Sequence, residues 1–125
     1  MSNINIPDEP SDEIRNQIHK WATTDATTIV TLPTGLDTQP LLTQEILMII
    51  KVGTLLGVHI DKSIALEILS TKIETTIRHK TAFTAFETTN VSYPITIPIK
   101  INIIAKILED VGLATFKYFN EQYNK

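Results

Sequence analysis

The sequence predicts an all-α fold, a compact bundle of about four helices around a central apolar helix. Hydrophobic residues form 42% and charged residues 20% of the 125-residue chain, which is typical of a globular domain. Apolar residues recur at three- and four-residue spacing in several stretches, the periodicity of a helix with one buried face. A chain of this length suits one domain with one core. We therefore expect a flexible lead-in over residues 1–10 and a single helical domain over residues 11–125.

The first helix should begin near Ser11, whose hydroxyl can accept a backbone N–H bond, because Asp12 and Glu13 favour the positive end of the helix dipole. It should end near Val30, before a Pro- and Gly-containing break over residues 31–39. Its predicted apolar stripe consists of Ile14, Ile18, Trp21, Ala22, Ala26 and Ile29.

Residues 41–57 are so apolar that we expect them to form the central helix, covered on most sides. Pro40 suits the first position of this helix, and Gly57 is expected to end it in a left-handed conformation. The helix has only a narrow predicted polar line, which consists of Gln44, Lys51 and Thr54.

Asp61 is the predicted N-cap of a third helix, which could extend to Phe86. Isoleucines then alternate with other residues around Pro98, so an edge strand stays open as an alternative, and we expect an irregular or briefly extended segment near residues 88–97. Helical spacing returns afterwards and predicts a last helix over residues 97–123.

Charge and cysteine content exclude several classes of protein. Four acidic residues and no basic ones lie in residues 1–13, which leaves 10 acidic against 11 basic residues in the rest of the chain. A near-neutral body argues against nucleic acid as a partner, because phosphate binding needs clustered Lys and Arg. The absence of cysteine and of a secretory signal pattern favours a cytoplasmic location. We expect no transmembrane segment, while peripheral membrane contact stays open.

Three stretches, residues 32–42, 48–53 and 56–60, together with residues 108–114 and Tyr118-Phe119, resemble the YcjF-like family of GTPase-associated helical domains of unknown function. The resemblance implies a bacterial source and a partner that is a GTPase system at or near the membrane, or a second copy of the chain. No G-x-x-x-x-G-K-[ST] loop is present, so GTPase activity would belong to another protein.

Catalytic and metal-binding patterns are not found in the sequence. His19, His59 and His79 lack the short helical spacing that builds a metal site. Glu109 and Asp110 are neighbours that should point to different helix faces and form a solvated surface. We therefore expect no enzymatic activity, no metal and no cofactor.

Asp25 is the charged residue most out of place, because it falls near the middle of the first helix's apolar stripe. A buried carboxylate is costly unless it is paired. Asp25 could cap a frayed helix end or pair with a lysine such as Lys51 or Lys106, in which case its replacement by Ala should cost on the order of 3 kcal/mol. Alternatively, it could serve a ligand pocket.

Asp37, Thr38 and Gln39 precede the second helix, where free N–H groups and polar side chains could hold a small anion or a partner group, or could simply cap the helix. Threonines on the first helix could form a partner surface or bond back to their own carbonyls.

The sequence thus favours a non-enzymatic helical interaction module, which works with a GTPase system or as a homo-oligomer. The alternative is a lipid- or small-ligand-binding helical domain with a pocket near Asp25. The candidate interaction or ligand residues are Asp25, Asp37, Thr38, Gln39 and Lys51.

Overall fold

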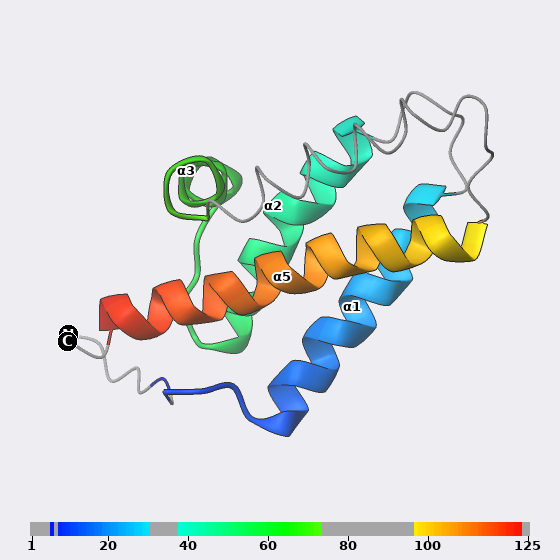
Figure 1. Cartoon of the computed structure of the whole chain (residues 1–125). Coiled ribbons are helices and arrows are strands. Elements are labelled where there is room, and N and C mark those ends of the chain that lie inside the picture. Colours follow the sequence, from blue (N-terminus) through cyan, green and yellow to red (C-terminus); the bar gives the residue numbers. More distant parts are fainter. Residues whose placement is uncertain (1–5, 7, 31–37, 74–96, 124–125) are drawn as a thin grey trace.

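The computed structural model describes residues 6, 8–30, 38–73 and 97–123, and these residues form four α-helices and no strand. The helices are α1 (Asp12–Val30), α2 (Thr38–Leu55), α3 (Lys62–Lys72) and α5 (Ile97–Tyr123). α5 crosses both α1 and α2, and α2 also packs against α1 and α3 (Figure 1). The predicted all-α bundle is confirmed, and α2 contacts each of the other three described helices, as expected of a central helix.

α1 begins where the sequence predicts. The backbone N–H of Ile14 donates to Ser11 Oγ at 3.2 Å, which satisfies one of the free donors at the helix start. Four residues of the predicted stripe are buried with at most 1% exposure, namely Ile18, Ala22, Ala26 and Ile29. Their spacing places them on one face, which α5 covers.

α2 ends in a Schellman motif, the two-bond arrangement that satisfies the last carbonyls of a helix. The N–H of Val58 donates to the carbonyl of Gly53 at 2.7 Å, and the N–H of Gly57 donates to that of Thr54 at 3.0 Å. The geometry requires a left-handed residue, and Gly57 supplies it with φ of +82°. The prediction for Gly57 is confirmed.

α3 starts at the predicted cap, since the N–H of Ile64 donates to Asp61 Oδ1 at 2.9 Å. The predicted extension to Phe86 is wrong, because the helix ends at Lys72 and Ile73 leaves the helical region with φ of −113° and ψ of 79°. β-branched residues such as Ile73 are weak helix formers. Residues 74–96, including the segment predicted to be irregular or extended, lie outside the described residues.

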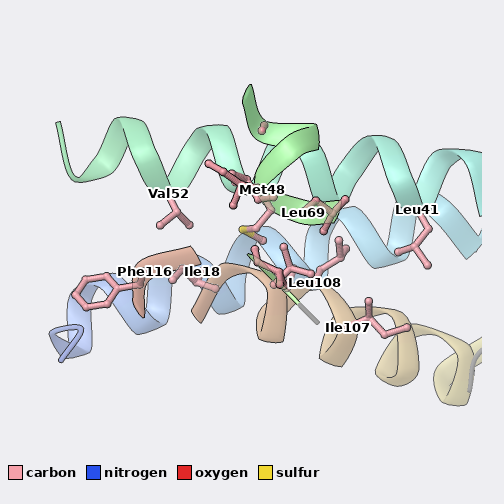
Figure 2. Close-up of a cluster of buried hydrophobic side chains, with 14 of the residues drawn as sticks. Ile18, Leu41, Met48, Val52, Leu69, Ile107, Leu108 and Phe116 are labelled. Carbon is pink, nitrogen blue, oxygen red and sulfur yellow. The ribbon is translucent and has the colours of Figure 1, made fainter. Parts of the chain in front are cut away.

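α5 spans the predicted range and closes the core (Figure 2). Side chains of α1, α2 and α3 meet it there, among them Ile18, Met48 and Leu69. Gly112 marks the tightest crossing. A Cβ added to it would lie 2.6 Å from Ile18 Cγ2 and 3.2 Å from Met48 Sδ, so three helices meet at a point that has no room for a methyl group.

Ile6 departs from the expected flexible lead-in over residues 1–10. Its side chain is buried with 1% exposure as part of the core, and its carbonyl accepts a hydrogen bond from Asn120 Nδ2 at 3.3 Å. No helical periodicity marks Ile6 in the sequence, because this residue lies outside the described helices. This residue ties the start of the chain to the end of α5.

None of the four described helices combines the length and apolar character that crossing a membrane requires.

Candidate functional site

The structure brings together two of the predicted site residues, Asp25 of α1 and Lys51 of α2. Lys51 Nζ lies 3.7 Å from Asp25 Oδ2 and 5.5 Å from the ring centroid of Trp21. Trp21 and Asp25 are four residues apart on α1, so both face the same lysine. This is the lysine pairing that the sequence offered as one alternative for Asp25, with Lys51 rather than Lys106 as the partner.

The Asp25–Lys51 pair is poorly compensated. The Asp25 side chain is 15% exposed and that of Lys51 is 35% exposed, so the acid is the more deeply buried partner. Asp25 Oδ2 is buried without a hydrogen bond from any described residue. Burial raises the pKa of the Asp25 carboxyl, and the nearby Lys51 ammonium offsets only part of this effect. The pair therefore joins α1 to α2 at a cost in desolvation.

The other predicted site residues do not join this pair. Thr38 and Gln39 form the first turn of α2, and Asp37 and the side chains of both lie outside the described residues. At about 1.5 Å per residue, Thr38 lies roughly 20 Å along α2 from Lys51. The first turn of α2 and the Asp25–Lys51 pair are therefore separate places on the molecule.

The acids Glu109 and Asp110 differ from the predicted solvated surface, because both are half-buried and each contacts a basic side chain. Glu109 Oε1 lies 2.9 Å from Nδ1 of the exposed His19, across the α1–α5 contact. Asp110 Oδ1 accepts from Lys106 Nζ at 2.9 Å, one turn earlier on α5. The two neighbours contact different partners, as follows from their predicted position on different helix faces.

Two threonines on the exposed side of α1 bond back to their own helix. Thr27 Oγ1 donates to the carbonyl of Thr23 at 2.9 Å, and Thr28 Oγ1 donates to that of Thr24 at 3.2 Å. This is the local use that the sequence left open beside a partner surface.

Glu45 is a buried charge that the sequence interpretation missed. Its side chain is fully buried, with 0% exposure, on the face of α2 that also carries Leu41 and Met48. The signal was present in the spacing, because Glu45 lies four residues after Leu41 and three before Met48.

A cleft of about 730 Å³ opens between α3 and the C-terminal end of α5, with the loop after α2 at its base. We call it the α3/α5 cleft. It is lined by Gly57, Val58, His59, Ile60, Ile64, Glu67, Ile68, Thr71, Lys72, Tyr118, Phe119, Gln122 and Tyr123. Its volume is in the range of ligand- and peptide-binding sites, and its lining contains neither Asp25 nor Lys51.

Apolar side chains on both walls of the α3/α5 cleft are open to solvent. Ile64 on α3 is 44% exposed and Tyr123 on α5 is 42% exposed. Tyr123 continues a row of aromatic rings in which Phe119 lies 5.4 Å from Tyr118 and 6.3 Å from Tyr123 between centroids. Ile64 lies four residues before the buried Ile68, a helical spacing typical of a core residue, but α3 buries only the side that packs on α2.

Hydrogen bonds at both ends of the α2–α3 loop fix the base of the cleft. The Schellman motif at Gly57 and the Asp61 cap hold the two ends of the α2–α3 loop, and Val58 between them is buried. In Figure 1 this loop passes beside the C-terminal end of α5. Because the Schellman motif and the Asp61 cap hold this loop, the cleft is already formed in the chain alone.

A smaller hollow of about 320 Å³ continues the cleft along α5 and shares Lys72, Tyr118 and Gln122 with it. It adds Ile73 on the α3 side and, on α5, Ala114, Lys117 and Glu121. The two hollows therefore meet at Lys72, Tyr118 and Gln122, and the smaller one lies further round α5 on the side of Ala114.

Within the described ranges, no three or more His, Asp or Glu side chains gather so that they could hold a metal ion. His19 and His59 lie on different parts of the molecule, the first beside Glu109 and the second in the cleft, and His79 is outside those ranges.

No protein-family model, curated protein or solved structure matches the chain. The similarity to the GTPase-associated helical family therefore stays a prediction that rests on the sequence stretches themselves.

Proposed function

We propose that this chain is a non-enzymatic interaction module that binds a partner protein through the α3/α5 cleft. The observation that carries the proposal is the pair of exposed apolar side chains, Ile64 and Tyr123, on facing walls of a preformed cleft. Exposed apolar surface of this kind is costly in water and is typical of a protein-binding site when it lines a groove.

The partner's class follows from the family resemblance rather than from the cleft. That resemblance favours a GTPase system, and a second copy of the chain is the other candidate. Both would use the same surface, because burial of Ile64 and Tyr123 supplies the apolar contact that either needs.

The experiment compares two positions on one helix. Ile64 lines the cleft and Leu66 does not, although both are 44% exposed. A photo-crosslinking amino acid is placed at position 64 or at position 66 of the full chain, in cells that express it. We expect a discrete crosslinked protein from position 64 and none from position 66. The same products from both positions, or no product from position 64, would refute the proposal.

A second candidate function is a small-ligand domain with its site near Asp25, which the buried and unbonded Asp25 Oδ2 favours. A ligand that donates a hydrogen bond there would satisfy this oxygen. Thermal denaturation with a panel of lipids and amines tests it, because a ligand of the folded state raises the melting midpoint. The shift should disappear in Asp25→Asn if Asp25 holds the ligand.

A further inference from the structure

Near its C-terminal end α5 has two faces, and a different part of the chain meets each of them. On one face, Tyr118, Phe119, Gln122 and Tyr123 line the α3/α5 cleft. On the other, a hollow of about 660 Å³ lies between α5, Arg15 of α1 and residues 8–10. Its α5 residues are Leu113, Phe116, Lys117, Asn120 and Glu121. The two sets share no residue, and at about 3.6 residues per turn they lie on opposite faces of the helix.

Ile6 attaches the chain to α5 on the face away from the cleft. Its carbonyl accepts a hydrogen bond from Asn120 Nδ2 at 3.3 Å, and its side chain is buried in the same core cluster as Phe116 and Phe119. Asn120 is the last described residue of α5 that is not exposed, because residues 121–123 are all open to solvent. Ile6 is therefore attached where α5 leaves the core. We call this attachment the Ile6–Asn120 clasp.

The C-terminal end of α5 needs support from outside the helix. The last four carbonyls of an α-helix have no partner within it, and terminal turns open more readily than central ones. The last turn of α5 has no basic residue to stabilise the negative end of the helix dipole. Phe119 packs against Gly53 of α2, since a Cβ added to Gly53 would lie 3.4 Å from the Phe119 ring. The clasp holds the helix from another side.

We infer that the Ile6–Asn120 clasp holds the last two turns of α5 and thereby sets the position of the α5 wall of the α3/α5 cleft. Ile6 is then a positioning residue, because it acts through Asn120 and the helix and does not itself line the cleft. When Ile6 leaves the core, residues 117–123 lose support on one side and the cleft wall loosens with them. The effect on binding rests on the proposed function, whereas the clasp itself does not.

Amide hydrogen exchange of the full chain tests the clasp with two matched variants. Ile6 and Ile29 are both core residues with 1% exposure, so Ile6→Ala and Ile29→Ala remove the same groups from equally buried positions. Ile29 lies in the last turn of α1, which Figure 1 shows on the side of the molecule where α5 begins, away from its C-terminal end. Amides of residues 48–52 in α2 report the loss of global stability in each variant.

The expected result is a local change at the end of α5. Relative to residues 48–52, the amides of residues 117–123 should exchange at least about tenfold faster in Ile6→Ala than in the wild type. In Ile29→Ala the same ratio should change by less than about twofold. An equal ratio in the two variants would overturn the inference, because Ile6 would then be a core residue like any other.

A second pair of variants tests the hydrogen bond and leaves Ile6 in place. Asn120→Asp removes the Nδ2 donor, while Gln122→Glu introduces the same charge on the cleft face of α5. Both add an acid near the negative end of the helix, so the effect of the helix dipole is common to both. Residues 117–123 should exchange about threefold faster or more in Asn120→Asp than in Gln122→Glu. Equal exchange would mean that Asn120 takes no part in holding α5, which overturns the clasp.

Crosslinking from position 64 tests the effect on the cleft. The yield of crosslinked partner should fall at least about threefold in Ile6→Ala and stay within about twofold of the wild type in Ile29→Ala. An unchanged yield in Ile6→Ala would overturn the inference that the clasp sets the cleft. If the wild type gives no crosslink, the proposed function fails, and the exchange measurements still decide whether the clasp holds the end of α5.

Discussion

The middle and the end of α5 differ in how completely they are covered. At Gly112 the helix meets α1 and α2 with no room for a methyl group, while at Tyr123 it forms the wall of an open cleft. The same helix thus contributes a closed crossing and an open groove within about three turns. Stability and binding can therefore be separated by substitution, because the exposed Ile64 and Tyr123 are not among the residues of the buried core.

Phe116 is the largest fully buried side chain among the described residues, so its truncation should have the largest effect on stability. Phe116→Ala removes an aromatic side chain of the core that is 1% exposed and leaves a cavity in its place. We expect the free energy of unfolding to fall by about 3–5 kcal/mol in chemical denaturation. A fall of less than about 1 kcal/mol would mean that the core at this point can collapse, or that it is looser than the structure shows.

Gly112→Ala should have the next largest effect. The new methyl group would lie 2.6 Å from Ile18 Cγ2, a stiff β-branched side chain with no free space around it. Overpacking of this kind costs about 1–3 kcal/mol. The exposed Thr54→Ala variant on α2 is a control. An unchanged melting midpoint for Gly112→Ala would contradict the closed crossing.

Gly57→Ala tests backbone conformation without a steric clash, because nothing lies within 4 Å of the added Cβ. The residue has φ of +82°, which costs a non-glycine residue about 1 kcal/mol. The free energy of unfolding should fall by that amount. A greater loss would mean that the Schellman turn also supports the α3/α5 cleft, and binding of a partner through the cleft should then weaken too.

How well the sequence predicted these features depends on how far apart in the chain the residues that form them lie. The caps at Ser11 and Asp61 and the left-handed Gly57 are local, since the residue type and its immediate neighbours specify them, and all three are confirmed. The end of α3 was predicted too far along the chain, because the apolar spacing continues after Ile73 in the sequence. The Asp25–Lys51 pair was one of several alternatives left open beside a helix cap, a pair with Lys106 and a ligand pocket, because helix periodicity does not show which helices become neighbours.

The α3/α5 cleft could not be predicted because its walls are distant in the sequence. Residues 57–72 form one part and residues 118–123 the other, and their approach depends on how α2 and α5 cross. Ile64 has helical spacing typical of a core residue and is nevertheless 44% exposed. Glu45 shows the opposite case, a charged residue that tertiary packing buries completely.

Asp25→Asn should have a small effect whose sign depends on pH. Burial raises the pKa of Asp25 above its ordinary value of 3.8, so the folded state favours the protonated acid. The contribution of Asp25 to stability is therefore fully present below pH 3.8 and is lost as the pH rises through the raised pKa. Asn does not titrate, so Asp25→Asn should become more stable relative to the wild type as the pH rises through this range.

At neutral pH the Asp25→Asn change should be within about 1 kcal/mol of the wild type. Lys51 is one-third exposed and can be hydrated when the acid is removed, so even Asp25→Ala should cost less than expected for an acid paired with a buried base. Denaturation of Asp25→Asn and of the wild type at a series of pH values from below 3.8 to neutral gives the difference between them. If the wild type instead becomes more stable relative to Asp25→Asn as the pH rises, the ion pair stabilises the fold.

The central claim is that the C-terminal end of α5 and the facing side of α3 form the binding surface. Calorimetry tests it most directly, with the partner protein identified by photo-crosslinking from position 64 as the titrant. Ile64→Glu and Leu66→Glu are compared with the wild-type chain, and both substitutions should alter the free energy of unfolding by no more than about 0.5 kcal/mol because both side chains are exposed. Ile64→Glu should weaken binding by about tenfold or more, while Leu66→Glu should bind as the wild type does. Equal affinity of the two variants for the partner would contradict the account.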